Sequence, residues 1–67
     1  MNDQLSKREM QVLKKLWDGL DYEQTAHALR LKRSYIKNLH DRIRLKLNAG
    51  NRVQVVRKAL EKGWISL

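Results

Sequence analysis

The chain has 67 residues and no cysteine, so it suffices for one small domain and offers neither a disulfide nor a thiolate metal ligand. Fifteen lysines and arginines against seven aspartates and glutamates give a formal net charge of +8, which favours a polyanionic partner. No apolar run approaches the roughly 20 residues of a membrane span, and the N-terminus lacks the apolar stretch of a signal peptide. We therefore expect one cytoplasmic domain over residues 1–67, without membrane contact.

A first helix is predicted to begin after Ser6. Ser6 and Glu9 have the capping-box spacing, in which a hydroxyl and a carboxylate each satisfy a free backbone N–H at a helix start. The helix is expected to run to about Trp17, and Gly19 marks its end because glycine tolerates the left-handed conformation found there. Apolar residues at helical spacing form its predicted buried stripe: Leu13, Leu16, Trp17 and Leu20.

The second helix has a similar beginning and leads into a short turn. Asp21 with Gln24 repeats the capping pattern, and the helix is expected to end near Leu29, before a turn at Arg30-Leu31. Ala26 is a small side chain of the kind that steeply crossing helices need at their contact point. This spacing is typical of a helix-turn-helix unit.

Two further helices complete an expected all-α, four-helix domain. The third runs from about Arg33 to Leu47 with four residues pointing inward, namely Ile36, Leu39, Ile43 and Leu47. Asn48-Ala49-Gly50 interrupts it, and Asn51 with Gln54 gives a third capping pattern. The fourth helix ends at Gly63, and its core-facing side is predicted to consist of Val53, Val56, Ala59 and Leu60.

The outer face of the predicted third helix carries side chains suited to base edges. Lysine donates to guanine O6 and N7, asparagine pairs with adenine N6 and N7, and aspartate accepts from cytosine N4. We therefore predict that Lys37, Asn38 and Asp41 contact bases of double-stranded DNA. The alternative is an ordinary solvated face with an ion pair between Lys37 and Asp41. Asp41 has a further alternative role, which is to orient Lys37 or Arg44.

Cations at the start of this helix oppose its macrodipole, which normally disfavours positive charge at an N-terminus. A DNA phosphate there would accept hydrogen bonds from the side chains and from the free backbone N–H groups. Simple surface charge is the competing explanation. The residues predicted to bind phosphates are Lys32, Arg33, Ser34, Tyr35, Arg44 and Arg30.

An ordered set of residues spanning almost the whole chain resembles the LuxR-type DNA-binding domain, also called GerE-like. The set comprises Leu5-Ser6-x-Arg8-Glu9, Val12-Leu13, Gly19-Leu20, Ala26, Leu29, Ile36-Lys37, Ile43, Lys46-Leu47 and Asn51-Arg52-x-Gln54. The resemblance implies a four-helix unit whose third helix enters the major groove, with Lys37 at the position of the family's groove-facing lysine. It also implies a dimer contact on the fourth helix, which we place at Val55, Lys58, Ala59 and Lys62.

The sequence departs from the family pattern at three positions. Arg30 stands where the family has glycine, so a positive φ there would cost roughly 1 kcal/mol or more. Lys32 replaces a residue able to cap the third helix, which makes Ser34 an alternative cap. Leu39 replaces a histidine, and His40 lies one residue out of register, so no role is transferred to it.

These observations predict a free-standing transcription regulator, associated with the nucleoid, that binds DNA as a homodimer. Repression is favoured because it needs promoter occupancy alone, whereas activation also needs a contact with RNA polymerase. Two alternatives are an antagonist that pairs with larger LuxR-type regulators and a nonspecific binder of polyanions or membrane surfaces. We expect no enzyme activity, cofactor or metal, because His27 and His40 lack further ligands at metal spacing.

Overall fold

The computed structural model describes residues 5–66 as four helices joined by short connections, with no strand in that range. The helices are α1 (Lys7–Trp17), α2 (Tyr22–Leu29), α3 (Arg33–Leu47) and α4 (Arg52–Glu61). The predicted all-α, four-helix architecture is therefore confirmed. No helix within residues 5–66 is long and apolar enough to cross a membrane.

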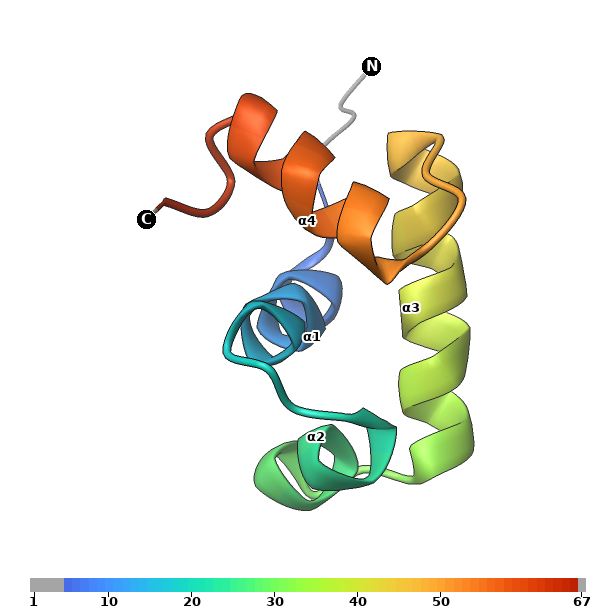
Figure 1. The fold of residues 1–67 in the computed structure, drawn as a ribbon. Coiled ribbons are helices and arrows are strands. Elements are labelled where there is room, and N and C mark those ends of the chain that lie inside the picture. Colours follow the sequence, from blue (N-terminus) through green and yellow to red (C-terminus); the bar gives the residue numbers. More distant parts are fainter. Residues whose placement is uncertain (1–4, 67) are drawn as a thin grey trace.

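The longest helix, α3, forms one side of the molecule. In Figure 1, α2 packs at its lower end, α4 crosses near its upper end, and α1 lies between them, all on the same side of α3. Each of these three helices contacts α3. The opposite side of α3 is consequently left open to solvent along its length.

Side-chain caps define three of the four helix starts. Ser6 with Glu9 and Asp21 with Gln24 form complete capping boxes at the N-termini of α1 and α2, as predicted. At α4 the Asn51 side chain accepts a hydrogen bond from the Gln54 N–H at 2.9 Å. The Gln54 side chain accepts from the N–H of Gly50, one residue before the cap. These bonds satisfy backbone donors that a helix start otherwise leaves free.

A continuous apolar core joins all four helices. Ala26 is buried at the contact of α2 with its neighbours, as the helix-turn-helix spacing predicts. Val12 is fully buried although it was outside the predicted stripe of α1, whereas Trp17 and Leu20 are half-buried. The buried apolar residues of α3 are the four predicted, Ile36, Leu39, Ile43 and Leu47.

The predicted core face of α4 is confirmed at Ala59 and wrong at Val53. Val55 and Ala59 are both 0% exposed and form its core contact, while Val53, assigned to the core from the sequence, is 69% exposed. Two apolar stripes coexist on this short helix, because Val53, Val56 and Leu60 also follow helical spacing. The second stripe faces outward at Val53 and only borders the core at Val56 and Leu60.

Arg30 adopts the left-handed conformation that the family pattern assigns to glycine. Its φ and ψ are 57° and 46°, and it closes the C-terminus of α2. The Arg30 N–H donates to His27 O and the Leu31 N–H donates to Ala26 O at 2.9 Å, so two of the last carbonyls of α2 are satisfied. The turn thus keeps its shape with a side chain in a region that disfavours one.

Two polar contacts connect helices across the core. Glu9 is 2% exposed, and its Oε1 accepts from the Lys46 ammonium at 2.7 Å and from the Ser6 N–H at 2.8 Å. Burial raises the pKa of Glu9, but the hydrogen bonds from Lys46 and Ser6 together outweigh it, so the pKa lies below its usual range. Arg52 on α4 donates to the carbonyls of Leu16 and Leu20 at 2.9 and 2.7 Å.

Replacing Arg30 by glycine should stabilise the domain by about 1 kcal/mol, because it removes the steric cost of a left-handed side chain. Urea unfolding monitored by circular dichroism measures this. Arg30→Ala is the matched control, since it removes the same charge but retains the Cβ atom. Equal stability of the glycine and alanine variants would contradict the assigned strain.

Replacing Lys46 by methionine should destabilise the domain by about 1 to 2 kcal/mol near neutral pH, because the buried Glu9 carboxylate loses its charged donor and Lys46 is partly solvent-screened. The lowered pKa of Glu9 means that its carboxylate stabilises the fold fully above the ordinary value of 4.5. This contribution is lost as pH falls through the folded-state pKa.

The penalty of Lys46→Met should therefore shrink in unfolding experiments as pH is lowered through the folded-state pKa of Glu9, where the carboxylate becomes protonated. Lys46→Arg, which retains the positive charge, is the control and should unfold nearly as the wild type does. An equal penalty at neutral and acid pH would exclude the assigned ion pair.

Candidate nucleic-acid interface

The outer face of α3 presents polar and basic side chains to solvent. Lys37, Asn38 and Arg42 are exposed, and the Asp41 side chain is 46% exposed. Leu45 continues this face toward the C-terminus and is 82% exposed. We use "outer face" below for these five residues. An α-helix with side chains has a diameter of about 10 to 12 Å, which matches the roughly 12 Å width of the DNA major groove.

The N-terminus of α3 has no side-chain cap. Lys32 occupies the N-cap position without a side-chain hydrogen bond, and the first turn contains no acidic residue. The alternative assignment of Ser34 as the cap is wrong, because the helix begins at Arg33. Lys32, Arg33 and Ser34 are all exposed beside these backbone N–H groups. Cationic side chains and free N–H donors at one place form a site suited to an anion.

A basic flank of α3 lies next to the first turn of α2. Tyr22, Arg33, Ser34 and Lys37 line a surface hollow of about 340 Å³. A neighbouring hollow is lined by Tyr22 and Arg33 together with Asp21 and other residues of the α2 N-terminus. The first turns of α2 and α3 therefore flank one hollow, with Arg33 and Lys37 on its α3 side.

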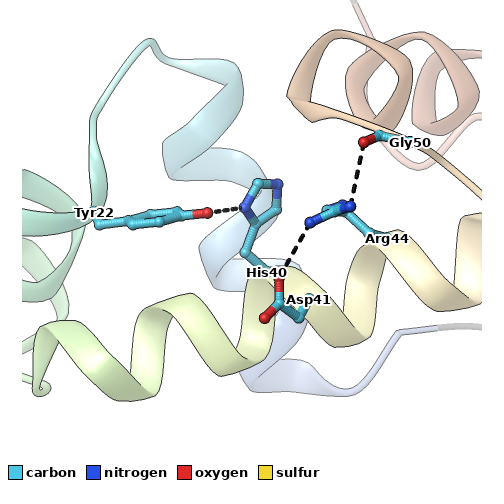
Figure 2. Close-up of polar contacts among 5 residues, drawn as sticks. All are labelled: Tyr22, His40, Asp41, Arg44 and Gly50. Carbon is cyan, nitrogen blue, oxygen red and sulfur yellow. Dashed lines mark hydrogen bonds and ion pairs between the residues drawn. The ribbon is translucent and has the colours of Figure 1, made fainter.

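Arg44 is held in place by two contacts. Figure 2 shows its guanidinium between Asp41 and Gly50, with Nη1 3.3 Å from Asp41 Oδ1 and Nη2 3.2 Å from the Gly50 carbonyl. The ion pair agrees with the alternative that Asp41 orients Arg44. The Arg44 side chain remains 40% exposed, so it is still accessible from solvent.

Tyr22 and His40 form a polar contact that was not predicted from the sequence. The Tyr22 hydroxyl lies 2.5 Å from His40 Nδ1, and the rings meet edge to face with centroids 5.5 Å apart (Figure 2). Burial lowers the pKa of His40, with Arg44 and Arg52 adding to this effect and Asp41 opposing it. One signal was available, because His40 follows the buried Ile36 by one helical turn.

Within residues 5–66, no three histidine, aspartate or glutamate side chains are grouped so that they would hold a metal ion. Two basic residues that match the family pattern have partners within the fold. Lys46 binds the buried Glu9, and Arg52 closes the C-terminus of α1. These two side chains therefore hydrogen-bond to groups of the protein itself.

The predicted dimer surface is wrong in two of its four residues. Val55 and Ala59 are fully buried in the monomer core, so they are unavailable to a partner. Lys58 donates to the Asn48 carbonyl at 2.7 Å, and the Lys62 ammonium lies 5.5 Å from the centre of the Trp64 ring. The exposed side of α4 instead includes Val53 and Arg57.

Comparison with known proteins agrees with this arrangement. Residues 3–59 match the family described as bacterial regulatory proteins, luxR family. The chain belongs to this family. It is thus a LuxR-type DNA-binding domain of the kind found in transcriptional regulators, and the predicted resemblance is confirmed.

This LuxR-type domain is 33% identical over 60 residues to the transcriptional regulatory protein DesR of Bacillus subtilis, covering 90% of the chain and 30% of DesR. It is 30% identical over 63 residues to the transcriptional regulatory protein DegU of Brevibacillus brevis, covering 94% of the chain and 27% of DegU. Its fold matches the crystal structure of the phage VqmA-DPO complex with a TM-score of 0.88 and 31% identity, over 100% of the chain and 31% of that protein. The chain spans less than a third of each relative.

Proposed function

We propose that this LuxR-type domain binds specific sequences of double-stranded DNA as a symmetric dimer and represses transcription by occupying promoters. The observation that carries the proposal is the uncapped, cation-rich start of α3 beside an exposed outer face that begins with Lys37 and Asn38. A helix in the major groove places its N-terminal residues against base edges. The phosphate backbone then passes the ends of the flanking helices.

Lys37 and Asn38 are the base-contacting residues of this proposal. Both are exposed in the first half of α3, where side chains reach furthest into a groove entered by the helix N-terminus. Asp41 has a different role in this proposal, because its Oδ1 atom accepts a hydrogen bond from Arg44. We assign Asp41 to orienting that guanidinium toward a phosphate, which also reduces repulsion between its own carboxylate and the DNA backbone.

The phosphate contacts come from the turn before α3 and from its first residues. Exposed side chains on both sides of the uncapped N-terminus supply them, namely Arg30, Lys32, Arg33, Ser34 and Tyr35. Tyr35 is 40% exposed, which leaves it accessible to a phosphate oxygen. Arg44 supplies a further contact from the same flank of α3. These contacts set the position of the helix and contribute affinity without sequence preference.

The dimer contact is assigned to the outward stripe of α4. Val53 is 69% exposed, and Val56 and Leu60 lie partly exposed next to it at helical spacing. Arg57 completes this surface. A two-fold axis at this stripe would pair apolar side chains from both copies and place two α3 helices on half-sites about one DNA turn apart.

Selection of bound sequences from a random DNA pool, at fixed salt, tests the base-contacting assignment. Lys37→Ala should relax the preference at one position in each half-site and cost about 1 to 3 kcal/mol on the preferred sequence. Arg33→Ala is the matched comparison and should weaken all sequences alike. The slope of log affinity against log salt concentration should decrease by about one for Arg33→Ala, because one phosphate contact is lost.

Equal effects of Lys37→Ala and Arg33→Ala on preference would contradict this division between bases and phosphates. A wild-type domain without any sequence preference at moderate ionic strength would contradict the proposed function itself.

Val53→Asp should weaken binding to a two-half-site DNA by about tenfold, or about 1.4 kcal/mol, because it places a charge in the proposed dimer contact. Binding to a single half-site, measured in parallel, corrects for the added negative charge. Val55→Ala serves as the contrast for α4, since it should lower stability by about 1 to 3 kcal/mol through loss of core packing. A loss on Val53→Asp that is the same for one half-site and for two would rule out a dimer contact at Val53.

A further inference from the structure

One flank of α3 is attached to the segments before and after it in the chain. His40 contacts Tyr22, the first residue of α2, and one turn later Arg44 donates to the carbonyl of Gly50, which precedes α4 (Figure 2). Asn51 and Arg52, at the start of α4, line the same hollow of about 420 Å³. One of the contacts between α2 and α3 is therefore made by an ionisable side chain.

His40 is buried among groups that favour its neutral form. It is 4% exposed, and its Nε2 atom has no hydrogen-bond partner among residues 5–66. A neutral imidazole accepts a hydrogen at one nitrogen, whereas the imidazolium must donate from both. Protonation would leave a hydrogen on both nitrogens, so Nδ1 could no longer accept from the Tyr22 hydroxyl, and it would place a positive charge in a buried position.

The charged groups around His40 come from three helices. Arg44 on α3 and Arg52 on α4 oppose a positive imidazolium, and Asp41 on α3 favours it. From α2, Tyr22 contacts the ring and Asp21 lines the same hollow, where it caps its own helix. Among the described residues, no charged side chain of α1 lines this hollow. Burial and the two arginines outweigh Asp41, so the closed arrangement holds the neutral ring.

We propose that His40 is a positioning residue for DNA recognition. Its neutral imidazole, through Tyr22, holds the first turn of α2 next to α3, and its protonation releases this arrangement. The inference rests on the proposed function, because the hollow beside Tyr22 lies between the two helix starts that would flank a DNA phosphate. His40 itself touches no base or phosphate and acts through Tyr22.

The direction of the pH effect follows from the two states. In the closed state the pKa of His40 lies below the ordinary 6.5, while in the released state burial no longer lowers it. The closed state is therefore fully favoured above the ordinary value and loses this advantage as pH falls toward the closed-state pKa. DNA that selects the closed state should bind less tightly over the same range. DNA phosphates acting on an exposed histidine would give the opposite sign.

The experiment measures affinity for the selected DNA at constant salt between about pH 7.5 and pH 5.5, the range in which histidine titrates. The wild type should lose about threefold or more on acidification, while circular dichroism shows that it stays folded. His40→Asn replaces the imidazole by an amide that can still hydrogen-bond the Tyr22 hydroxyl but does not titrate. This variant should bind well at the higher pH and lose the acid-dependent weakening.

Two further variants separate the contact from general effects. Tyr22→Phe keeps the ring and removes the hydroxyl, so its affinity at the higher pH should fall to about the acid-weakened level of the wild type. His27→Gln removes an exposed histidine of α2 and should retain the wild-type pH profile. Wild-type affinity that does not fall on acidification, or His40→Asn that retains the weakening, would overturn the proposal.

A measurement without DNA keeps the two proposals distinguishable. In nuclear magnetic resonance titrations of the free domain, the backbone amides of the first turn of α2 should shift together with the His40 ring. If the chemical shifts of the α2 amides did not change with the His40 titration, the positioning role would be overturned even if specific DNA binding were demonstrated. A coupled titration in a domain without sequence preference would retain the α2–α3 contact and reject the proposed function.

Discussion

The burial of one face of α3 against the other three helices determines which side chains of this domain remain available to DNA. Ile36, Leu39 and Ile43 are 2% exposed or less, so α3 cannot rotate about its axis without exposing them to water. Burying such side chains contributes about 1.5 to 3 kcal/mol each, which is a large share of the stability of a small domain. The outer face is therefore presented in a fixed orientation as a consequence of core packing.

The positive charge of the chain is divided between the fold and the surface. Lys46 neutralises a buried carboxylate, and Arg52 donates to backbone carbonyls near the end of α1. Such contacts suit a small core, where polar groups near the interior must be satisfied because few apolar residues surround them. At the start of α3, Lys32 makes no capping hydrogen bond and the first turn contains no acidic residue to pair with the cations there. A count of basic residues consequently overstates how many face a polyanion, and their contacts decide which do.

Local features of the sequence predicted most of the fold. Capping patterns at Ser6, Asp21 and Asn51 mark helix starts correctly because the hydrogen bonds involved span three residues and need no tertiary partner. The core face of α4 was predicted wrongly at Val53 because tertiary contacts, rather than local spacing, decide it. Its two apolar stripes satisfy helical spacing equally well, and contacts with α1 and α3 select the one containing Val55. The same holds for the candidate site. Helical spacing predicted the exposed face of α3, but not the Tyr22–His40 contact between two helices.

The sequence by itself determined the four helices, their limits, the inward face of α3 and the family to which the chain belongs. These depend on local hydrogen bonds and on a repeat of apolar residues strong enough to leave one solution. Only the tertiary structure decided that Val53 faces outward and that Arg30 accepts a left-handed conformation. It also brought Tyr22 within hydrogen-bond distance of His40, 18 residues along the chain. Such contacts arise from how helices cross, and the spacing of residues within one helix carries no information about that crossing.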